Sequence, residues 1–141
     1  TTVKINSFKK FYKKNNLDVT TNNIINCSHS YCGGKKGALE LFERNLAYPY
    51  KIICSSDTIA IGALRELLSL GVKIPEQVSI MGFSNIEVSS LTTPSLSTVD
   101  QKLFELGRKS GYLFIDILHE KYPLNKKTYL EYELIIREST N

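Results

Sequence analysis

Apolar and polar positions along the chain follow two different periods, and their alternation predicts helices separated by short strands. Apolar side chains recur every three or four residues in segments that predict helices over 7–16, 35–46, 57–70 and 102–119. Short runs rich in apolar and β-branched residues predict strands over 24–25, 51–54, 78–83, 96–99 and 129–137. The segment 84–94 is polar and is expected to be a loop.

The helix predicted over 57–70 has the clearest pattern. Its apolar stripe consists of Ala60, Ala63, Leu64, Leu67 and Leu68. Gly71 stands just after it and Pro75 follows, as expected where a helix stops. The pair Gly33–Gly34 is interpreted as a break in the chain before the helix over 35–46.

Strands that alternate with helices indicate βαβ units, an α/β fold class and a mostly parallel sheet flanked by helices. Functional loops in such a sheet lie at the carboxyl ends of the strands. Three segments occupy that place, namely 55–57, 84–85 and 26–34. Small polar side chains beside helix N-termini suit a polar ligand.

Length and composition describe an ordinary globular domain. The chain has 141 residues and a net charge of +4, and five lysines fall in its first 14 residues without an acidic residue among them. Such a patch can attract nucleic acid, but at helical spacing a solvated helix face is favoured. The sequence contains no apolar run long enough to span a membrane and no signal-peptide pattern, so no membrane partner is expected. Three cysteines without a CxxC pair favour a reducing compartment, hence the cytoplasm.

The polar residues Ser55, Ser56 and Asp57 raise the question of catalysis. A serine nucleophile needs a base and an oxyanion hole, and the G-x-S-x-G elbow is absent. We therefore expect no enzyme activity. The simplest interpretation is that one of the three residues caps the following helix.

The stretch CSHSYC, from Cys27 to Cys32, suggests a metal site, yet no second pair of ligands follows at a suitable spacing. Phosphate-binding and dinucleotide motifs are also absent, and Gly33–Gly34–Lys35 alone is too short to count as one. We therefore expect neither a metal nor a cofactor.

Four blocks in the second half of the chain resemble the LacI/GalR family of bacterial transcription regulators. The blocks are SSDTIAIGAL, then GVKIPEQVSIMGFSN, then TPSLSTVDQ and finally ELIIREST. Family members typically read N-D-x-x-A-x-G-A-L, G-x-x-x-P-x-D-v-S-v-x-G-F-D, P-x-L-T-T-v-x-Q and L-x-x-R-x-S-T. The match runs from about residue 51 to residue 140, with the blocks in the family's order and spacing.

The resemblance implies a type I periplasmic-binding-protein-like fold, in which two α/β lobes close on a small ligand. Residues 1–141 would form the C-terminal lobe, with the helix 102–119 crossing to the other lobe and the strand 129–137 returning. The first lobe would be largely missing and the DNA-binding domain absent, so we expect a fragment. The implied partners are operator DNA, reached only through that domain, and a small effector.

The resemblance also assigns effector-binding residues, several of which depart from the family pattern. The family's effector-contacting arginine falls on Lys4, its asparagine on Ser56, and its aspartate after G-F on Ser84, which Asn85 follows. Its stacking aromatic falls at or beside Cys32, where Tyr31 is the candidate, and Gln101 matches the glutamine at the cleft edge. On this basis we expect Asp57 to cap its helix and Ser56 to face a ligand cleft.

Loss of the arginine fork and of the acceptor carboxylate weakens the case for a neutral hexose. The expected effector is a sugar, a phosphorylated sugar or another polar metabolite, and loss of effector binding is the alternative.

The resemblance places the segment 84–94 near the dimerisation face of the family. Val88 and Leu91 are the apolar candidates for a homodimer interface, and local packing beneath a loop is their alternative. The helix 102–119 has apolar residues on more than one face, which predicts that it self-associates or rearranges in the isolated chain.

Three functions remain open at this point. The favoured one is the effector-binding and dimerisation portion of a LacI-type transcriptional regulator, expected to be a repressor that a small polar ligand controls. The second is a solute-binding protein of the same fold that serves transport or sensing. The third is a small α/β enzyme, against which the lack of an acid–base pair around the strand ends argues.

Overall fold

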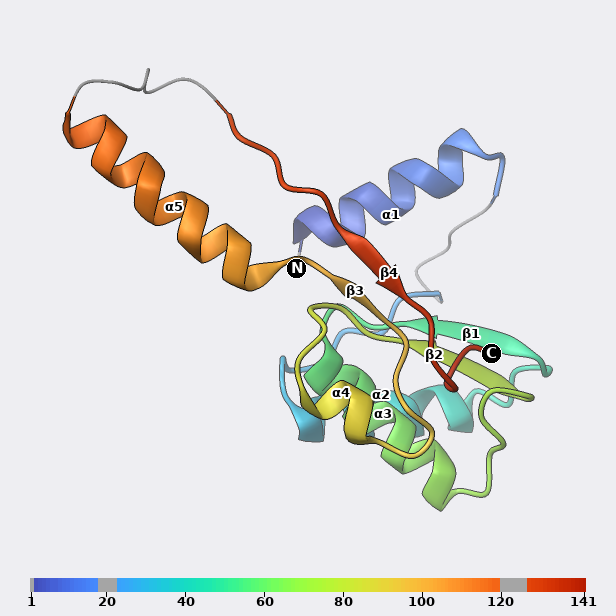
Figure 1. Ribbon diagram of the computed structural model, residues 1–141. Helices are drawn as coiled ribbons and strands as arrows, with labels where there is room; N and C mark the ends of the chain where they lie inside the picture. The colour runs from blue at the N-terminus through green and yellow to red at the C-terminus, as the bar shows by residue number, and fades with distance from the viewer. Residues whose placement is uncertain (1, 18–22, 120–126) are drawn as a thin grey trace.

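A computed structural model describes residues 2–17, 23–119 and 127–141, which form nine helices and strands within those ranges (Figure 1). In chain order they are α1 Thr2–Lys14, α2 Tyr31–Glu43, β1 Tyr50–Ile53, α3 Asp57–Ser69, β2 Val78–Met81, α4 Val88–Leu91, β3 Thr98–Asp100, α5 Leu103–Leu118 and β4 Glu133–Ile135. The predicted α/β class is confirmed.

The strands form two short ladders joined by a single bridge. β1 and β2 pair in parallel, with Tyr50 opposite Val78, and the bridge between Met81 and Ser97 continues in parallel toward β3. β3 and β4 pair antiparallel. The strand predicted over 129–137 is therefore shorter than expected and runs against its neighbour.

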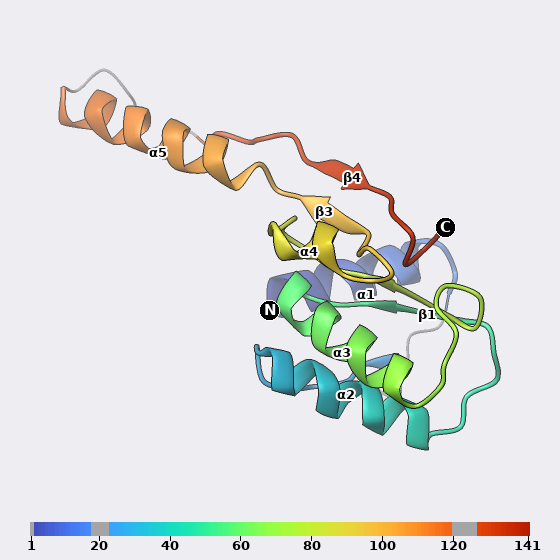
Figure 2. The same ribbon diagram turned by 60° about the horizontal axis from the view of Figure 1, so that its bottom comes forward.

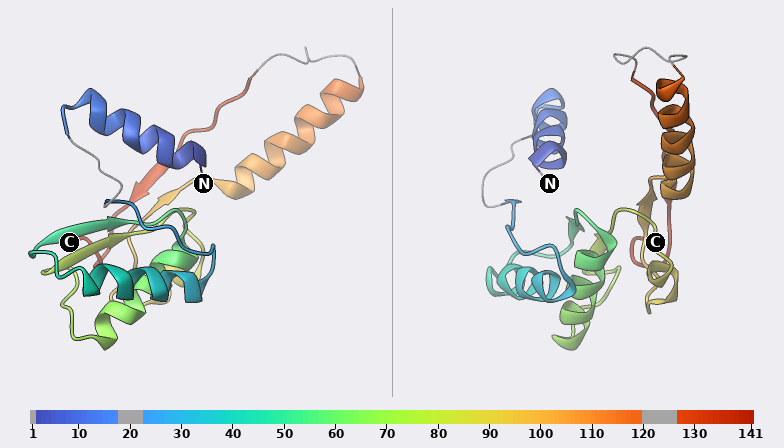
Figure 3. Two further views of the ribbon diagram at one scale, coloured as in Figure 1. Left: turned by 180° about the vertical axis from the view of Figure 1, so that it is seen from behind. Right: turned by 90° about the vertical axis from the view of Figure 1, so that its left-hand side faces the viewer.

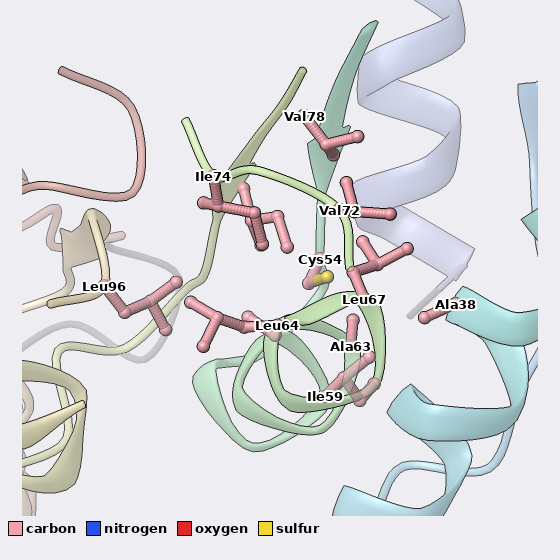
Figure 4. Close-up of a cluster of buried hydrophobic side chains, with 12 residues drawn as sticks. Ala38, Cys54, Ile59, Ala63, Leu64, Leu67, Val72, Ile74, Val78 and Leu96 are labelled. Atoms are coloured by element: carbon pink, nitrogen blue, oxygen red, sulfur yellow. The ribbon is translucent and has the colours of Figure 1, made fainter. Parts of the chain in front are cut away.

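Helices cover both faces of the β1–β2 ladder. α2 and α3 lie together on one face, and α1 lies on the other (Figures 1 and 2). α3 contributes more of the core than any other element, because its apolar stripe faces β2 and α2 (Figure 4). The buried apolar side chains are Ala38, Cys54, Ile59, Ala60, Ala63, Leu64, Leu67, Val72, Ile74, Val78, Ile80 and Leu96.

Two glycines set the close approach of α2 and α3. A Cβ atom on Gly34 would lie 2.0 Å from the carbonyl oxygen of Ile59, and one on Gly62 would lie 2.1 Å from that of Tyr31. The prediction that Gly33–Gly34 breaks the chain before the helix is wrong. Both residues lie in the first turn of α2, where Ser30 is the N-cap and its hydroxyl accepts a hydrogen bond from the Gly33 amide.

The end of α3 confirms the stop signal predicted at Gly71. Gly71 has a φ angle of +79°, which residues with a side chain rarely adopt. Its amide donates to the carbonyl of Leu68, and the amide of Val72 donates to that of Leu67. This pair of bonds closes a Schellman motif, and the burial of Val72 supports it.

Two predictions about local structure are wrong. Residues 24–25 do not form a strand, and the side chain of Ile25 lies against α2, where a Cβ on Gly37 would be 3.2 Å from its Cγ2 atom. The polar segment 84–94 contains the short helix α4, which the polar pattern did not reveal.

α5 projects away from the rest of the chain (Figure 3). None of its residues is buried, although several of its apolar side chains are large. Among the helices that the structure describes, none is both long and apolar enough to cross a membrane.

Candidate functional site

The start of α3 is built by Ser56 and not by Asp57. Ser56 is the N-cap, and its hydroxyl accepts a hydrogen bond from the Ile59 amide at 3.4 Å. Asp57 is the first helical residue and is almost fully buried. The prediction that Asp57 caps the helix is therefore wrong, because the carboxylate points away from the helix end and toward the neighbouring loops.

The Asp57 carboxylate joins three segments at the carboxyl ends of the strands. It accepts hydrogen bonds from the Ile86 amide at 2.8 Å and from the Thr98 hydroxyl at 2.6 Å. A Cβ on Gly82 would lie 2.1 Å from the Asp57 Oδ1 atom, so the position directly after β2 requires a residue without a side chain. Asp57 thus holds the loop after β2 against α3 and β3.

Ser84 and Asn85 follow β2 with positive φ angles of 121° and 53°. Residues other than glycine rarely adopt such backbone angles, so hydrogen bonds from neighbouring segments must hold this loop in its conformation. The Ser84 hydroxyl donates to Oε1 of Gln101 at 3.2 Å, and both residues are half-buried. The structure therefore brings together two of the predicted effector-binding residues, from segments 17 residues apart.

Asn85 uses its side chain within the protein. Its amide nitrogen donates to Asp100 at 3.2 Å, and its amide oxygen accepts from Arg137 at 2.9 Å. Both ends of the amide are thus engaged, which distinguishes Asn85 from Ser84 as a candidate for ligand contact.

Lys4 reaches the same edge of the sheet from α1. Its ammonium group donates to the carbonyl of Ser55 at 2.9 Å and lies 3.7 Å from the centre of the Phe83 ring. Partial burial lowers the pKa of Lys4, and the nearby charge of Asp57 opposes that change. Lys4 therefore lies beside the loops that carry Ser56 and Ser84.

A pocket of about 430 Å³ opens next to these residues. It is lined by Phe83, Val99, Gln101, Leu106, Leu130, Glu131 and Tyr132. Most of this lining is apolar, and Gln101 and Glu131 supply its polar side chains. Glu131 was not identified from the sequence, because a β-rich pattern over 129–137 does not tell which side chains turn toward Phe83.

Tyr31 lies apart from this pocket. It is the first residue of α2, it is partly exposed, and it lines neither the pocket at Phe83 nor a smaller hollow of about 300 Å³. That hollow is lined by Asn26, Cys27, Ser28, Gly33, Lys36, Gly37 and Glu40. Within the described ranges, no group of three or more His, Cys, Asp and Glu residues could hold a metal ion.

Val88 and Leu91 lie on α4 with 51% and 72% of their surface exposed. Ser89 between them is fully buried. The helix therefore turns its apolar pair outward and its serine inward, which does not fit packing of Val88 and Leu91 beneath a loop.

Comparison with known proteins identifies relatives for nearly the whole chain. The family model of the periplasmic binding protein-like domain matches residues 5–140. The HTH-type transcriptional repressor CytR of Escherichia coli K12 is 37% identical over 92 residues, which are 65% of this chain and 27% of that protein. The regulator YvdE of Bacillus subtilis is 30% identical over 136 residues, which are 96% of this chain and 40% of that protein. The chain thus spans less than half the length of either relative.

Solved structures show the same similarity in three dimensions. The regulator CcpA of Lactococcus lactis is 28% identical, with a TM-score of 0.84 over 95% of this chain and 48% of that one. A LacI-family sugar-binding regulator of Escherichia coli, in complex with phosphate, is 28% identical with a TM-score of 0.81 over 94% and 47%. A LacI-family regulator of Enterococcus faecium with bound ribose is 30% identical with a TM-score of 0.70 over 81% and 41%.

The strand-end loops, the parallel ladder and these matches lead to one conclusion: the chain belongs to the family of periplasmic binding protein-like domains, in the form found in LacI-type transcriptional regulators.

Proposed function

We propose that this chain binds a small sugar-like effector as part of a LacI-type transcriptional repressor, which reaches operator DNA through a separate DNA-binding domain. One observation carries the proposal. Ser84 and Gln101 bond to each other at the pocket beside Phe83, and the Lys4 ammonium lies 3.7 Å from the centre of the same ring. Three segments far apart in sequence thus bring polar groups to one aromatic side chain, an arrangement that suits a small polar ligand.

The names of the relatives favour regulation over transport. CytR is a repressor, and other relatives are ribose operon repressors. The exposed free thiols of Cys27 and Cys32 support a reducing compartment, so the cytoplasm is the proposed location.

Two ligand classes follow from the charged groups near the pocket. Asp57 and Asp100 already accept hydrogen bonds from protein donors, so neither is proposed to accept one from a sugar hydroxyl. The acidic residue of the pocket lining is Glu131, which in this proposal accepts a hydrogen bond from a neutral sugar. Lys4 would instead favour a phosphorylated sugar, with the N-terminus of α3 beside it.

A pair of matched ligands separates these classes. Ribose and ribose 5-phosphate differ only in the phosphate group, and calorimetric titration of the purified chain measures each affinity. If the phosphate is recognised, Lys4→Gln weakens binding of the ester about tenfold, as loss of a charge-assisted hydrogen bond would, and Glu131→Gln has little effect on it. If a neutral sugar is preferred, Glu131→Gln weakens binding of ribose and Lys4→Gln has little effect on it.

The control variants make the same lysine-to-glutamine and glutamate-to-glutamine changes at positions outside the pocket. Lys10→Gln lies on the exposed face of α1, and Glu87→Gln lies just before α4. Gln101→Ala tests the pocket itself against a wider set of sugars, including the lactose and cellobiose held by two relatives' structures. An unchanged affinity for every bound ligand in Gln101→Ala would contradict the proposed site.

We further propose that the regulator is a homodimer and that Val88 and Leu91 contribute to its interface. The outward turn of these side chains on α4 supports this proposal, because large exposed apolar side chains next to each other often mark an interface.

A further inference from the structure

Arg137 lies two residues after β4 and bonds to three separate parts of the fold. Its NH1 group donates to the carbonyl of Leu96 at 2.6 Å and to the hydroxyl of Ser89 at 3.2 Å. Its NH2 group donates to the Asn85 amide oxygen at 2.9 Å. Among the described residues no carboxylate pairs with this guanidinium, so neutral acceptors hold its charge.

Asn85 continues the connection toward β3. Its side-chain nitrogen donates to Asp100, and its backbone amide donates to the Thr98 hydroxyl at 3.3 Å. Asp100 in turn accepts from the Lys102 amide at 2.7 Å, which is the main reason that the pKa of Asp100 is lowered. The side-chain amide of Asn85 is therefore held between the Arg137 guanidinium and the Asp100 carboxylate. It cannot rotate without losing the hydrogen bond on each side.

Ser89 provides the connection to α4. It is fully buried, and its hydroxyl donates to the Ile86 carbonyl at 2.6 Å while it accepts from Arg137. The Leu96 amide donates to the Ser89 carbonyl at 2.8 Å. The exposed pair Val88 and Leu91 flanks this buried residue on the same short helix.

We infer that Arg137 is a positioning residue that couples the strand-end loop at Asn85 to α4. A guanidinium group is planar and its donors have fixed directions, so a shift of Asn85 must either move Ser89 or break a bond to Arg137. A displacement at the loop thereby reaches the helix that carries Val88 and Leu91. The coupling itself is a property of the ligand-free chain, while its use by an effector rests on the proposed function.

The alternative is that Arg137 merely anchors the end of the chain to the sheet. Its backbone amide does bond to the Ser97 hydroxyl, and Ser139 bonds to both Ser97 and Ile80. An anchor would stabilise Asn85 and α4 independently of each other. A coupling residue makes the effect of a change at Asn85 on α4 depend on Arg137, and a double-mutant cycle separates the two cases.

The experiment measures amide hydrogen exchange by NMR in the 141-residue chain, whose mass of 16.0 kDa suits the method. The reporters are the amides of Ser89 and Ser90, which donate to the carbonyls of Ile86 and Glu87. The amide of Leu67 inside α3 reports unfolding of the whole chain. The variants are Asn85→Ala, Arg137→Lys and their combination, with Arg65→Lys on the exposed side of α3 as the matched control.

We expect Asn85→Ala and Arg137→Lys each to raise exchange at Ser89 and Ser90 about tenfold, with no change at Leu67. The combined variant should exchange no faster than Arg137→Lys alone, and Arg65→Lys should match the parent chain. Additive effects of the two substitutions, or unchanged exchange at α4, would overturn the coupling.

A second variant covers the case in which Arg137→Lys raises exchange at Leu67 and so disturbs the whole fold. Ser89→Ala removes the bond between α4 and Arg137 together with the local bond to the Ile86 carbonyl, and Asn85→Ala should then have no further effect at Ser90. These outcomes do not depend on any ligand, so failure of the coupling and failure of effector binding remain distinguishable.

Discussion

The hydroxyl of Thr98 donates a hydrogen bond to the carboxylate of Asp57 across 41 residues of sequence, with 2.6 Å between the two oxygens. Both side chains are almost fully buried. The bond ties the first turn of α3 to β3, and the bond from the Ile86 amide to the same carboxylate adds the loop between them. The candidate ligand site is therefore held together by one buried carboxylate.

Replacing Asp57 should destabilise the whole chain. Asp57→Ala leaves the Ile86 amide and the buried Thr98 hydroxyl without their acceptor, at a cost of about 3 kcal/mol in the free energy of unfolding. Urea unfolding measures this quantity. Glu87→Ala removes an exposed acid from the same loop and should change it little, and an equal loss in both variants would refute the role of the buried bonds.

Replacing glycine by alanine should lower the stability of the fold in α3 and raise it in α5. In Gly62→Ala the new methyl group meets the Tyr31 carbonyl and separates α2 from α3, with a loss of roughly 1–3 kcal/mol of stability. In Gly107→Ala nothing lies within 4 Å of the new Cβ, so the helix propensity of alanine adds about 1 kcal/mol to the stability of α5. Thermal unfolding of the two variants compares them directly, and a stable Gly62→Ala would contradict the close packing.

The three thiols should differ in reactivity. Cys27 and Cys32 are exposed, whereas Cys54 is buried and burial raises its pKa to about 12. Burial also raises the pKa of Cys27, and the two exposed thiols are expected to react with a disulfide reagent before Cys54 at about pH 8. Mass spectrometry of the labelled peptides gives the order, and early labelling of Cys54 would contradict it.

The raised pKa of Cys54 also predicts how stability depends on pH. The unfolded thiol loses its proton near its ordinary pKa of 9.0, while the folded thiol keeps it until about pH 12. The unfolded state therefore binds fewer protons in this range, and the free energy of unfolding falls as the pH rises between these values. Cys54→Ala should show a weaker decrease over the same range, and an unchanged slope would show that other groups cause it.

Dimerisation through α4 is tested at Leu91. In the intact regulator, Leu91→Asp places a charge in the proposed interface. It should raise the dissociation constant of the dimer, measured by sedimentation, by at least about tenfold. Ser90→Asp adds the same charge at the neighbouring exposed serine, which is not one of the proposed interface residues, and is the control. An unchanged dimer fraction in Leu91→Asp would place the interface elsewhere.

The isolated chain should self-associate through α5. Phe104 and Phe114 are 82% and 62% exposed, and α5 has no buried residue. Phe104→Glu combined with Phe114→Glu should lower the mass found by sedimentation at high concentration, whereas Lys109→Glu on the same helix should not. A parent chain that remains monomeric would contradict this prediction.

Local patterns of sequence predicted α3 well. Its apolar spacing, a polar cap within 55–57 and the glycine at 71 all act within a few residues of the chain, so the helix could be predicted from neighbours alone. The α/β class followed for the same reason. The resemblance assigned Lys4, Ser84 and Gln101 to an effector site; in the structure Lys4 lies over the Phe83 ring and Ser84 bonds to Gln101.

Tertiary structure alone decided the parts that depend on distant partners. Asp57 appeared to be a cap because capping is a local property, but Ile86 and Thr98 draw its carboxylate into the interior. Gly33 and Gly34 appeared to break the chain before a helix, whereas the backbone of α3 requires a residue without a Cβ at 34. The bonds from Arg137 to Asn85 and Ser89 span about 50 residues, and no local periodicity records which side chains meet over such a separation.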